Sequence, residues 1–205
     1  MIRAWLAIGL EAVFFGLAFG WRSWVQWRRT GSTGFIRPRR GAGAAELAGS
    51  GGFVVALVLL VAAPVADLAG LPRVALLDTT WAVIAGVIVG VCGIGLTLVS
   101  QLAMGDSWRI GVDASDRTEL VTGGVFGSVR NPIFTAMVVA TVGLVFLVPN
   151  LVGVAALVVL VAALEVQVRL VEEPYLRVVH GDVYDSYAAT VGRFVPRVGL
   201  APVPR

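Results

Sequence analysis

The chain has 205 residues, of which 58% are hydrophobic and 14% are charged, and its formal net charge at pH 7 is +3. With a mean hydropathy of +0.87, it is too apolar for a soluble globular domain, and its apolar runs reach the length of about 20 residues that a membrane-spanning helix needs. The runs do not alternate in polarity, which excludes a transmembrane β-barrel. The composition therefore predicts an all-α, polytopic helical membrane protein.

The first apolar run, at about residues 4–27, predicts a retained transmembrane helix rather than a signal peptide. Only Arg3 precedes its apolar core, whereas several arginines follow it, and signal peptides carry their positive charge on the opposite side. Its far end carries a tryptophan belt, which suits a membrane interface. The next segment, 28–51, is glycine-rich and contains five arginines, so we expect it to be a cytoplasmic loop.

Four more spans are predicted along the chain, at about 52–71, 81–103, 132–148 and 151–171. Only Pro149-Asn150 separates the last two, so they should form an antiparallel helical hairpin. Arginines near the span ends place the N-terminus outside and the C-terminus in the cytoplasm. We expect one membrane domain over 1–205, with three N-terminal spans in 1–103 and a core in 104–205, in a bacterial inner membrane.

The basic and sulfur-containing residues exclude several kinds of partner. All 16 basic residues are arginines and most lie beside apolar runs, which favours contact with membrane lipids over binding of nucleic acid. Cys92 and His180 are the only cysteine and histidine. A zinc or haem site built from His and Cys is thus excluded, and we predict no metal. Gly93 lies within a span, where a small residue usually permits tight helix packing.

Before the fourth span, a glycine-rich stretch ends in Arg130-Asn131-Pro132. Glycines let a backbone approach a ligand closely, and Pro132 is suited to the first position of a helix. Arg130 can bind a carboxylate or phosphate with two hydrogen bonds, and Asn131 is a candidate helix cap. The stretch alone is equally consistent with a capped helix and an arginine at the lipid interface.

The fifth span ends in a second polar group. Glu165, Arg169 and Glu173 follow one another at intervals of four, close to one helical face, which favours ion pairing. The adjacent Glu172 adds a second carboxylate, and Pro174 should bend the helix. Because the hairpin makes the two helix ends neighbours, we expect the arginine and amide to face the two glutamates. Such a pocket suits a zwitterionic cofactor such as S-adenosylmethionine.

These stretches resemble motifs of the isoprenylcysteine carboxyl methyltransferase and phospholipid methyltransferase superfamily of integral membrane enzymes. The motif-bearing stretches are Gly124-Val125-Phe126, Arg130-Asn131-Pro132-Ile133-Phe134, Glu172-Glu173-Pro174-Tyr175-Leu176 and His180 to Tyr184 with Tyr187. The resemblance covers about residues 100–200. It implies S-adenosylmethionine between the cytosolic helix ends and the C-terminal tail, and a lipid-side tunnel for an apolar, lipid-like acceptor.

The resemblance also implies roles for individual residues. The cofactor would be bound by Gly124, Val125, Phe126, Arg130, Asn131, Pro132, Glu172, Glu173 and Tyr187. Arg130 and Glu173 are the candidate catalytic residues. The acceptor substrate would contact Trp108, Arg109 and Tyr175.

The departures from the family pattern concern the acceptor. Val125-Phe126 stands where the family has Pro-Tyr, and Asn131 stands where many members have histidine. A carboxylate acceptor is already ionised at pH 7 and needs no general base, whereas an amine or thiol would require Glu173 to take a proton. Two alternatives stay open: an NADPH-dependent membrane sterol or steroid reductase, and a non-catalytic membrane scaffold.

Overall fold

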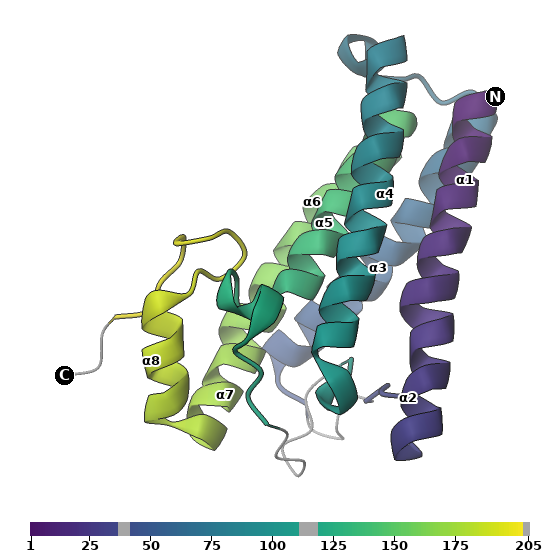
Figure 1. Cartoon of the computed structure of the whole chain (residues 1–205). Coiled ribbons are helices and arrows are strands. Elements are labelled where there is room, and N and C mark those ends of the chain that lie inside the picture. Colours follow the sequence, from purple (N-terminus) through teal and green to yellow (C-terminus); the bar gives the residue numbers. More distant parts are fainter. Residues whose placement is uncertain (37–41, 111–118, 203–205) are drawn as a thin grey trace.

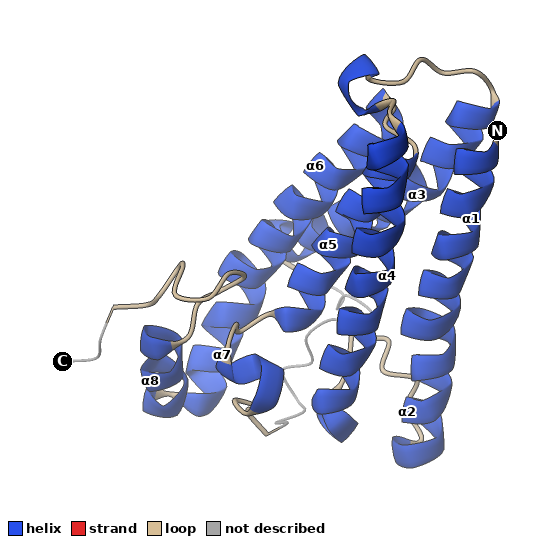
Figure 2. Ribbon diagram, turned by 45° about the horizontal axis from the view of Figure 1, so that its top comes forward, coloured by secondary structure: helices blue, strands red, loops and turns tan. Residues whose placement is uncertain are grey.

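The computed structural model describes residues 1–36, 42–110 and 119–202, and these residues form a helical bundle with no strand longer than an isolated bridge (Figures 1 and 2). The main helices are α1 (Ile2–Phe15), α2 (Arg22–Thr30), α3 (Ala44–Leu68), α4 (Thr80–Ala103), α5 (Pro132–Leu147), α6 (Leu151–Gln167), α7 (Glu173–His180) and α8 (Asp182–Thr190). Two π-helical segments, η1 (Gly16–Trp21) and η5 (Val168–Glu172), join α1 to α2 and α6 to α7. The predicted all-α class is confirmed.

Four helical stretches are long and apolar enough to cross a membrane: Ile2–Thr30, Ala44–Leu68, Thr80–Ala103 and Leu151–His180. The predicted fourth span is the shorter apolar helix α5, so the expected count of about five agrees with four long helices and this one. The prediction was wrong at the start of α3, which begins at Ala44 inside the expected loop. Its alanines and leucine favour helix, and Glu46 in the first turn complements the helix dipole.

The bundle is held by two extensive helix pairs, α4 with α5 and α3 with α6. In the first pair the backbones touch at glycines. A Cβ atom on Gly93 would lie 2.3 Å from the Ala140 nitrogen, and one on Gly143 would lie 2.3 Å from the Gly90 nitrogen. The packing role predicted for Gly93 is therefore confirmed. α5 and α6 also contact each other as the expected hairpin, although less extensively.

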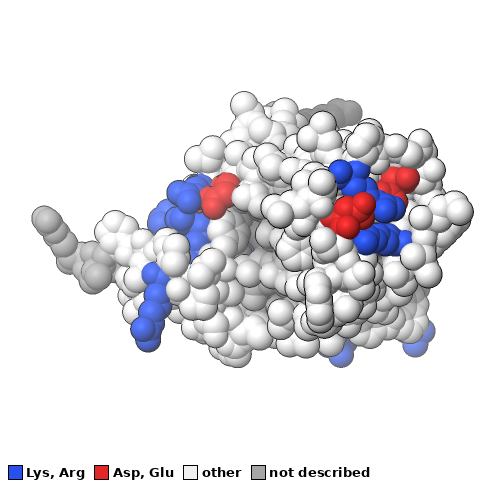
Figure 3. Space-filling model, turned by 90° about the horizontal axis from the view of Figure 1, so that it is seen from above, with Lys and Arg blue, Asp and Glu red and all other residues white. Residues whose placement is uncertain are grey.

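An ion-pair network joins the helix ends opposite α7 and α8. Arg73 binds both carboxylate oxygens of Asp67, at 2.6 and 2.7 Å, and Arg3 binds Asp78 at 2.6 Å. Figure 3 views this end of the bundle and shows acidic and basic side chains gathered in a compact group. The Asn150 amide donates to the Ala63 carbonyl at 2.8 Å, which fixes the hairpin turn against α3.

The glycine contact predicts a strong difference between two neighbouring substitutions. Gly93→Ala should lower the free energy of unfolding by about 1–3 kcal/mol, because the added methyl group has no room against Ala140. Gly95→Ala is the matched control, since nothing lies within 4 Å of a Cβ atom there. Thermal unfolding of both variants in detergent measures the difference, and equal stability would contradict the packing of α4 on α5.

Candidate functional site

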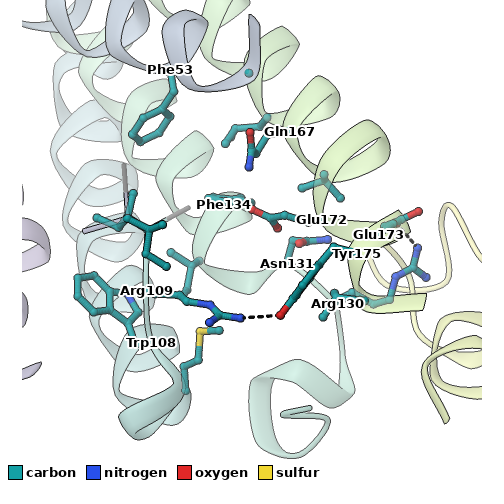
Figure 4. A pocket seen from close by; sticks show the side chains of 18 of the residues that line it. Phe53, Trp108, Arg109, Arg130, Asn131, Phe134, Gln167, Glu172, Glu173 and Tyr175 are labelled. Atoms are coloured by element: carbon teal, nitrogen blue, oxygen red, sulfur yellow. Dashed lines mark hydrogen bonds and ion pairs between the residues drawn. The ribbon is translucent and has the colours of Figure 1, made fainter. Parts of the chain in front are cut away.

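A cavity of about 600 Å³ lies where α3, α5 and α6 meet the segments that carry the polar residues (Figure 4). One part of its wall is polar and includes Arg109, Asn131 and Glu172, while Phe53 and Phe134 represent the apolar part. Of the residues predicted for the site, the lining includes Trp108, Arg109, Phe126, Arg130, Asn131, Pro132, Glu172, Glu173, Tyr175 and Tyr187. The cavity thus brings most of the predicted residues together.

Gly124 and Val125 are the predicted site residues that do not line this cavity. They belong to the turn η4 (Gly124–Gly127), where Gly124 has a φ of +60°. A positive φ favours glycine at this position, so the turn geometry accounts for this residue. Phe126 follows in the same turn and does reach the cavity.

The Glu173 carboxylate is buried between two arginines. Its Oε1 atom accepts hydrogen bonds from Arg130 Nη2 at 2.8 Å and from Arg193 Nε at 2.6 Å, and its Oε2 atom accepts from Arg193 Nη2 at 3.0 Å. Glu173 is 3% exposed and Arg130 is 6% exposed. The hydrogen bond to Glu173 raises the pKa of Arg193. The contact predicted between Arg130 and the glutamate pair is present, and Arg193 completes it.

Arg130 also fastens the C-terminal tail to the bundle. Its Nη1 atom donates to the Ala188 and Val191 carbonyls at 2.9 and 2.5 Å, and its Nη2 atom donates to the Gly199 carbonyl at 3.1 Å. With three backbone carbonyls bound to it, this guanidinium holds the tail in place. Most of its donors are already engaged by the protein.

The tail also satisfies the backbone at the start of α5. The Arg130 and Asn131 nitrogens donate to the Gly192 and Arg193 carbonyls at 2.8 and 3.1 Å. The Asn131 amide donates to the Arg193 carbonyl at 3.1 Å, and its side chain makes no capping bond to α5. The predicted cap at Asn131 was therefore wrong, because the tail takes up this side chain.

Glu172 differs from Glu173 in what it faces. It lines the cavity, and its polar neighbours are the Gln167 amide and Arg109. Figure 4 shows the Glu172 side chain toward the cavity, whereas Glu173, at the edge of the lining, points toward Arg130. The π-helical segment η5 precedes Glu173, whose backbone N–H donates to the Val168 carbonyl five residues earlier. Pro174 is the second residue of α7, which continues directly from η5.

The opposite wall is formed by the segment after α4. Trp108 is 2% exposed and lines the cavity. Arg109 donates from Nη2 to the Tyr175 hydroxyl at 3.4 Å, which links this segment to α7 across the polar end (Figure 4). The residues expected to contact a substrate therefore lie on two sides of one cavity.

Tyr187 supports the floor of the site. Its hydroxyl donates to the Phe126 carbonyl at 2.6 Å, and burial raises the pKa of Tyr187 to about 12. The phenol is thus a neutral hydrogen-bond donor at physiological pH. It fixes η4 against α8.

The predicted pair of Glu165 and Arg169 forms an ion pair on the surface, between α6 and η5, and lies outside the cavity lining. Sequence reasoning missed the part of the wall contributed by the first half of the chain, including Phe19 and Phe53. Their only signal is hydrophobicity, which every span shares. It also missed the role of Arg193, which is a single arginine in an irregular tail.

Comparison with known proteins identifies the core of this fold. Residues 81–183 match the family model described as phospholipid methyltransferase, and they contain α4, α5, α6 and α7, with Arg109, Arg130, Glu172 and Glu173. No curated protein gives a significant match to the chain. Because the family model matches half of the chain, the protein belongs to the phospholipid methyltransferase family, a group of membrane methyltransferases within the isoprenylcysteine carboxyl methyltransferase superfamily.

Proposed function

We propose that the protein is an S-adenosylmethionine-dependent methyltransferase that acts on an amphiphilic, lipid-like acceptor. The observation that carries the proposal is the cavity itself, which joins a charged end at Glu172 and Arg109 to an apolar part between α3, α5 and α6. An acceptor with a polar head and an apolar chain matches that distribution. With the topology expected from the arginines, this end of the bundle faces the cytoplasm of a bacterial cell.

The residues at the polar end fit the cofactor chemically. Glu172 can accept hydrogen bonds from an ammonium group or from ribose hydroxyls, whereas Arg109, on the facing wall beside Trp108, can bind the polar head of the acceptor. Asn131 lines the same end and offers an amide oxygen as a further acceptor. Arg130 and Glu173 are largely engaged with each other, Arg193 and the tail. We therefore assign these two residues to positioning the site, in place of the direct catalytic roles expected from the sequence.

When bound, S-adenosylmethionine supplies an electrophilic methyl group on its sulfonium. The protein's part is to align an acceptor nucleophile with that methyl group and to keep water away from it. In the transfer, the acceptor would form a bond to the methyl carbon as the carbon–sulfur bond breaks, and S-adenosylhomocysteine would be the leaving group. A carboxylate acceptor requires no proton transfer. For an amine acceptor Glu172 is the better placed base, because both oxygens of Glu173 already accept hydrogen bonds from arginine.

Binding of S-adenosylhomocysteine to the detergent-purified protein tests the cofactor. We expect saturable binding by calorimetric titration, and Glu172→Gln should weaken it by about tenfold or more, because a charged hydrogen-bond acceptor is lost. Glu165→Gln is the matched control, since it removes a carboxylate from the same helix outside the cavity. Absence of binding would reject the methyltransferase proposal, and binding of NADPH in its place would support the reductase alternative.

The neighbouring substitution Glu173→Gln should act on stability. Removing this carboxylate leaves the Arg130 and Arg193 charges without their partner, so the free energy of unfolding should fall by about 3–5 kcal/mol. Thermal unfolding in detergent measures the loss, with Glu172→Gln as the comparison. If Glu173→Gln were as stable as the wild type and lost only turnover, Glu173 would be a catalytic base and its positioning role would be wrong.

A further inference from the structure

The most unusual charge outside the polar end is Arg22, at the start of α2. It is 2% exposed, and no carboxylate of a described residue lies within ion-pairing distance of it. Asp106 lies in the short turn Gly105–Ser107 after α4, and its carboxylate is 3.6 Å from Arg29 instead. A buried cation without a paired anion is costly, so this arrangement calls for an explanation other than stability alone.

The guanidinium of Arg22 is held by carbonyls of the last turn of α4 and of the segment that follows it. Its Nη2 atom donates to the Gly105 carbonyl at 2.6 Å and to the Gln101 carbonyl at 3.5 Å. Its Nη1 atom donates to Gln26 Oε1 at 3.0 Å, and Gln26 Nε2 donates in turn to the Asp106 carbonyl at 2.7 Å. The N-terminal helix therefore determines the path of this segment.

The same guanidinium stacks on a residue of the cavity wall. Its central carbon lies 4.5 Å from the Trp108 ring centroid, within the range of a cation–π interaction, which is stronger when both groups are desolvated. Gly34 packs closely against the indole as well, since a Cβ atom on it would lie 2.6 Å from Trp108 Cζ3. Two backbone hydrogen bonds hold the same segment: the Ile110 nitrogen donates to the Gly34 carbonyl at 2.8 Å, and the Ile36 nitrogen donates to the Ile110 carbonyl at 2.9 Å. Trp108 is thus fixed by residues that precede α3, namely Arg22, Gly34 and Ile36.

These contacts cross the boundary of the family match. Trp108 and Arg109 lie inside residues 81–183, whereas Arg22, Gln26 and Gly34 lie outside them. We propose that Arg22 is a positioning residue that sets the acceptor side of the cavity through Trp108, so that the N-terminal helix controls which acceptor the methyltransferase core accepts. The inference rests on the proposed function, because it takes Trp108 to be on the acceptor side of the cavity, as the family resemblance implies.

Methyl transfer from radiolabelled S-adenosylmethionine into vesicles of the polar lipids of the protein's own membrane tests the inference. Arg22→Gln should raise the half-saturating vesicle concentration by about fivefold to tenfold, the effect of losing roughly one such contact. Its affinity for S-adenosylhomocysteine should stay within about twofold of the wild type, because the cofactor end is untouched. Arg22→Lys should restore part of the effect by keeping the charge.

The matched control is Arg28→Gln. Arg28 lies on the same helix and stacks on Trp24 with a distance of 5.2 Å to the ring centroid, but Trp24 is exposed on the outside of the bundle. Trp108→Leu should reproduce the Arg22→Gln effect without a change in charge, and the double variant should be no worse than either single one. An effect of Arg28→Gln equal to that of Arg22→Gln, or additive losses in the double variant, would overturn the proposal.

A second readout does not depend on turnover. In a Cys92→Ser background, maleimide labelling of Ile110→Cys should be at least about fivefold faster when Arg22→Gln is added, because the wall segment loses its anchor. Unchanged labelling would overturn the positioning role, as would parallel losses of thermal stability, cofactor affinity and turnover. If the wild type transfers no methyl group to these lipids and binds no S-adenosylhomocysteine, the proposed function fails, while the labelling still decides whether Arg22 holds the wall.

Discussion

The site depends on one buried carboxylate, Glu173, held between Arg130 and Arg193. None of these charges can be buried alone, because the cost of removing an unpaired ion from water is several kcal/mol. The three side chains come from the start of α7, the segment just before α5 and the C-terminal tail. The polar end of the cavity can therefore exist only when all three elements are docked together.

This constraint explains why two adjacent glutamates have different surroundings. Successive residues on a helix point about 100° apart, so two adjacent side chains can contact two different parts of the structure. Glu173 is directed to the tail, and Glu172 is left at the cavity (Figure 4). In the proposed function, Glu173 holds the frame of the site while Glu172 supplies a carboxylate to the ligand in the cavity. A double glutamate at the end of this span is thus two residues with separate tasks.

The sequence could predict features that are marked by long apolar runs or by a connection too short to allow more than one arrangement. Hydropathy located the helices, and the short Pro149-Asn150 turn correctly brought Arg130 and Glu173 to the same end. Arg193 could not be anticipated, because an arginine in an irregular tail has no periodicity that fixes its partner. The start of α3 was missed because small residues such as those near Ala44 are common in both loops and helices, and only packing against α6 decides between them.

The same distinction separates the two halves of the cavity. Its charged end is formed by residues whose chemistry is visible in a motif, and these lie in the region shared with the phospholipid methyltransferase family. Its remaining wall is set by packing and by Arg22, whose contacts are mostly with backbone carbonyls and an aromatic face. Such contacts constrain shape but leave no recurring sequence pattern. In the proposed function, the core carries out methyl transfer while the N-terminal helix shapes the space offered to the acceptor.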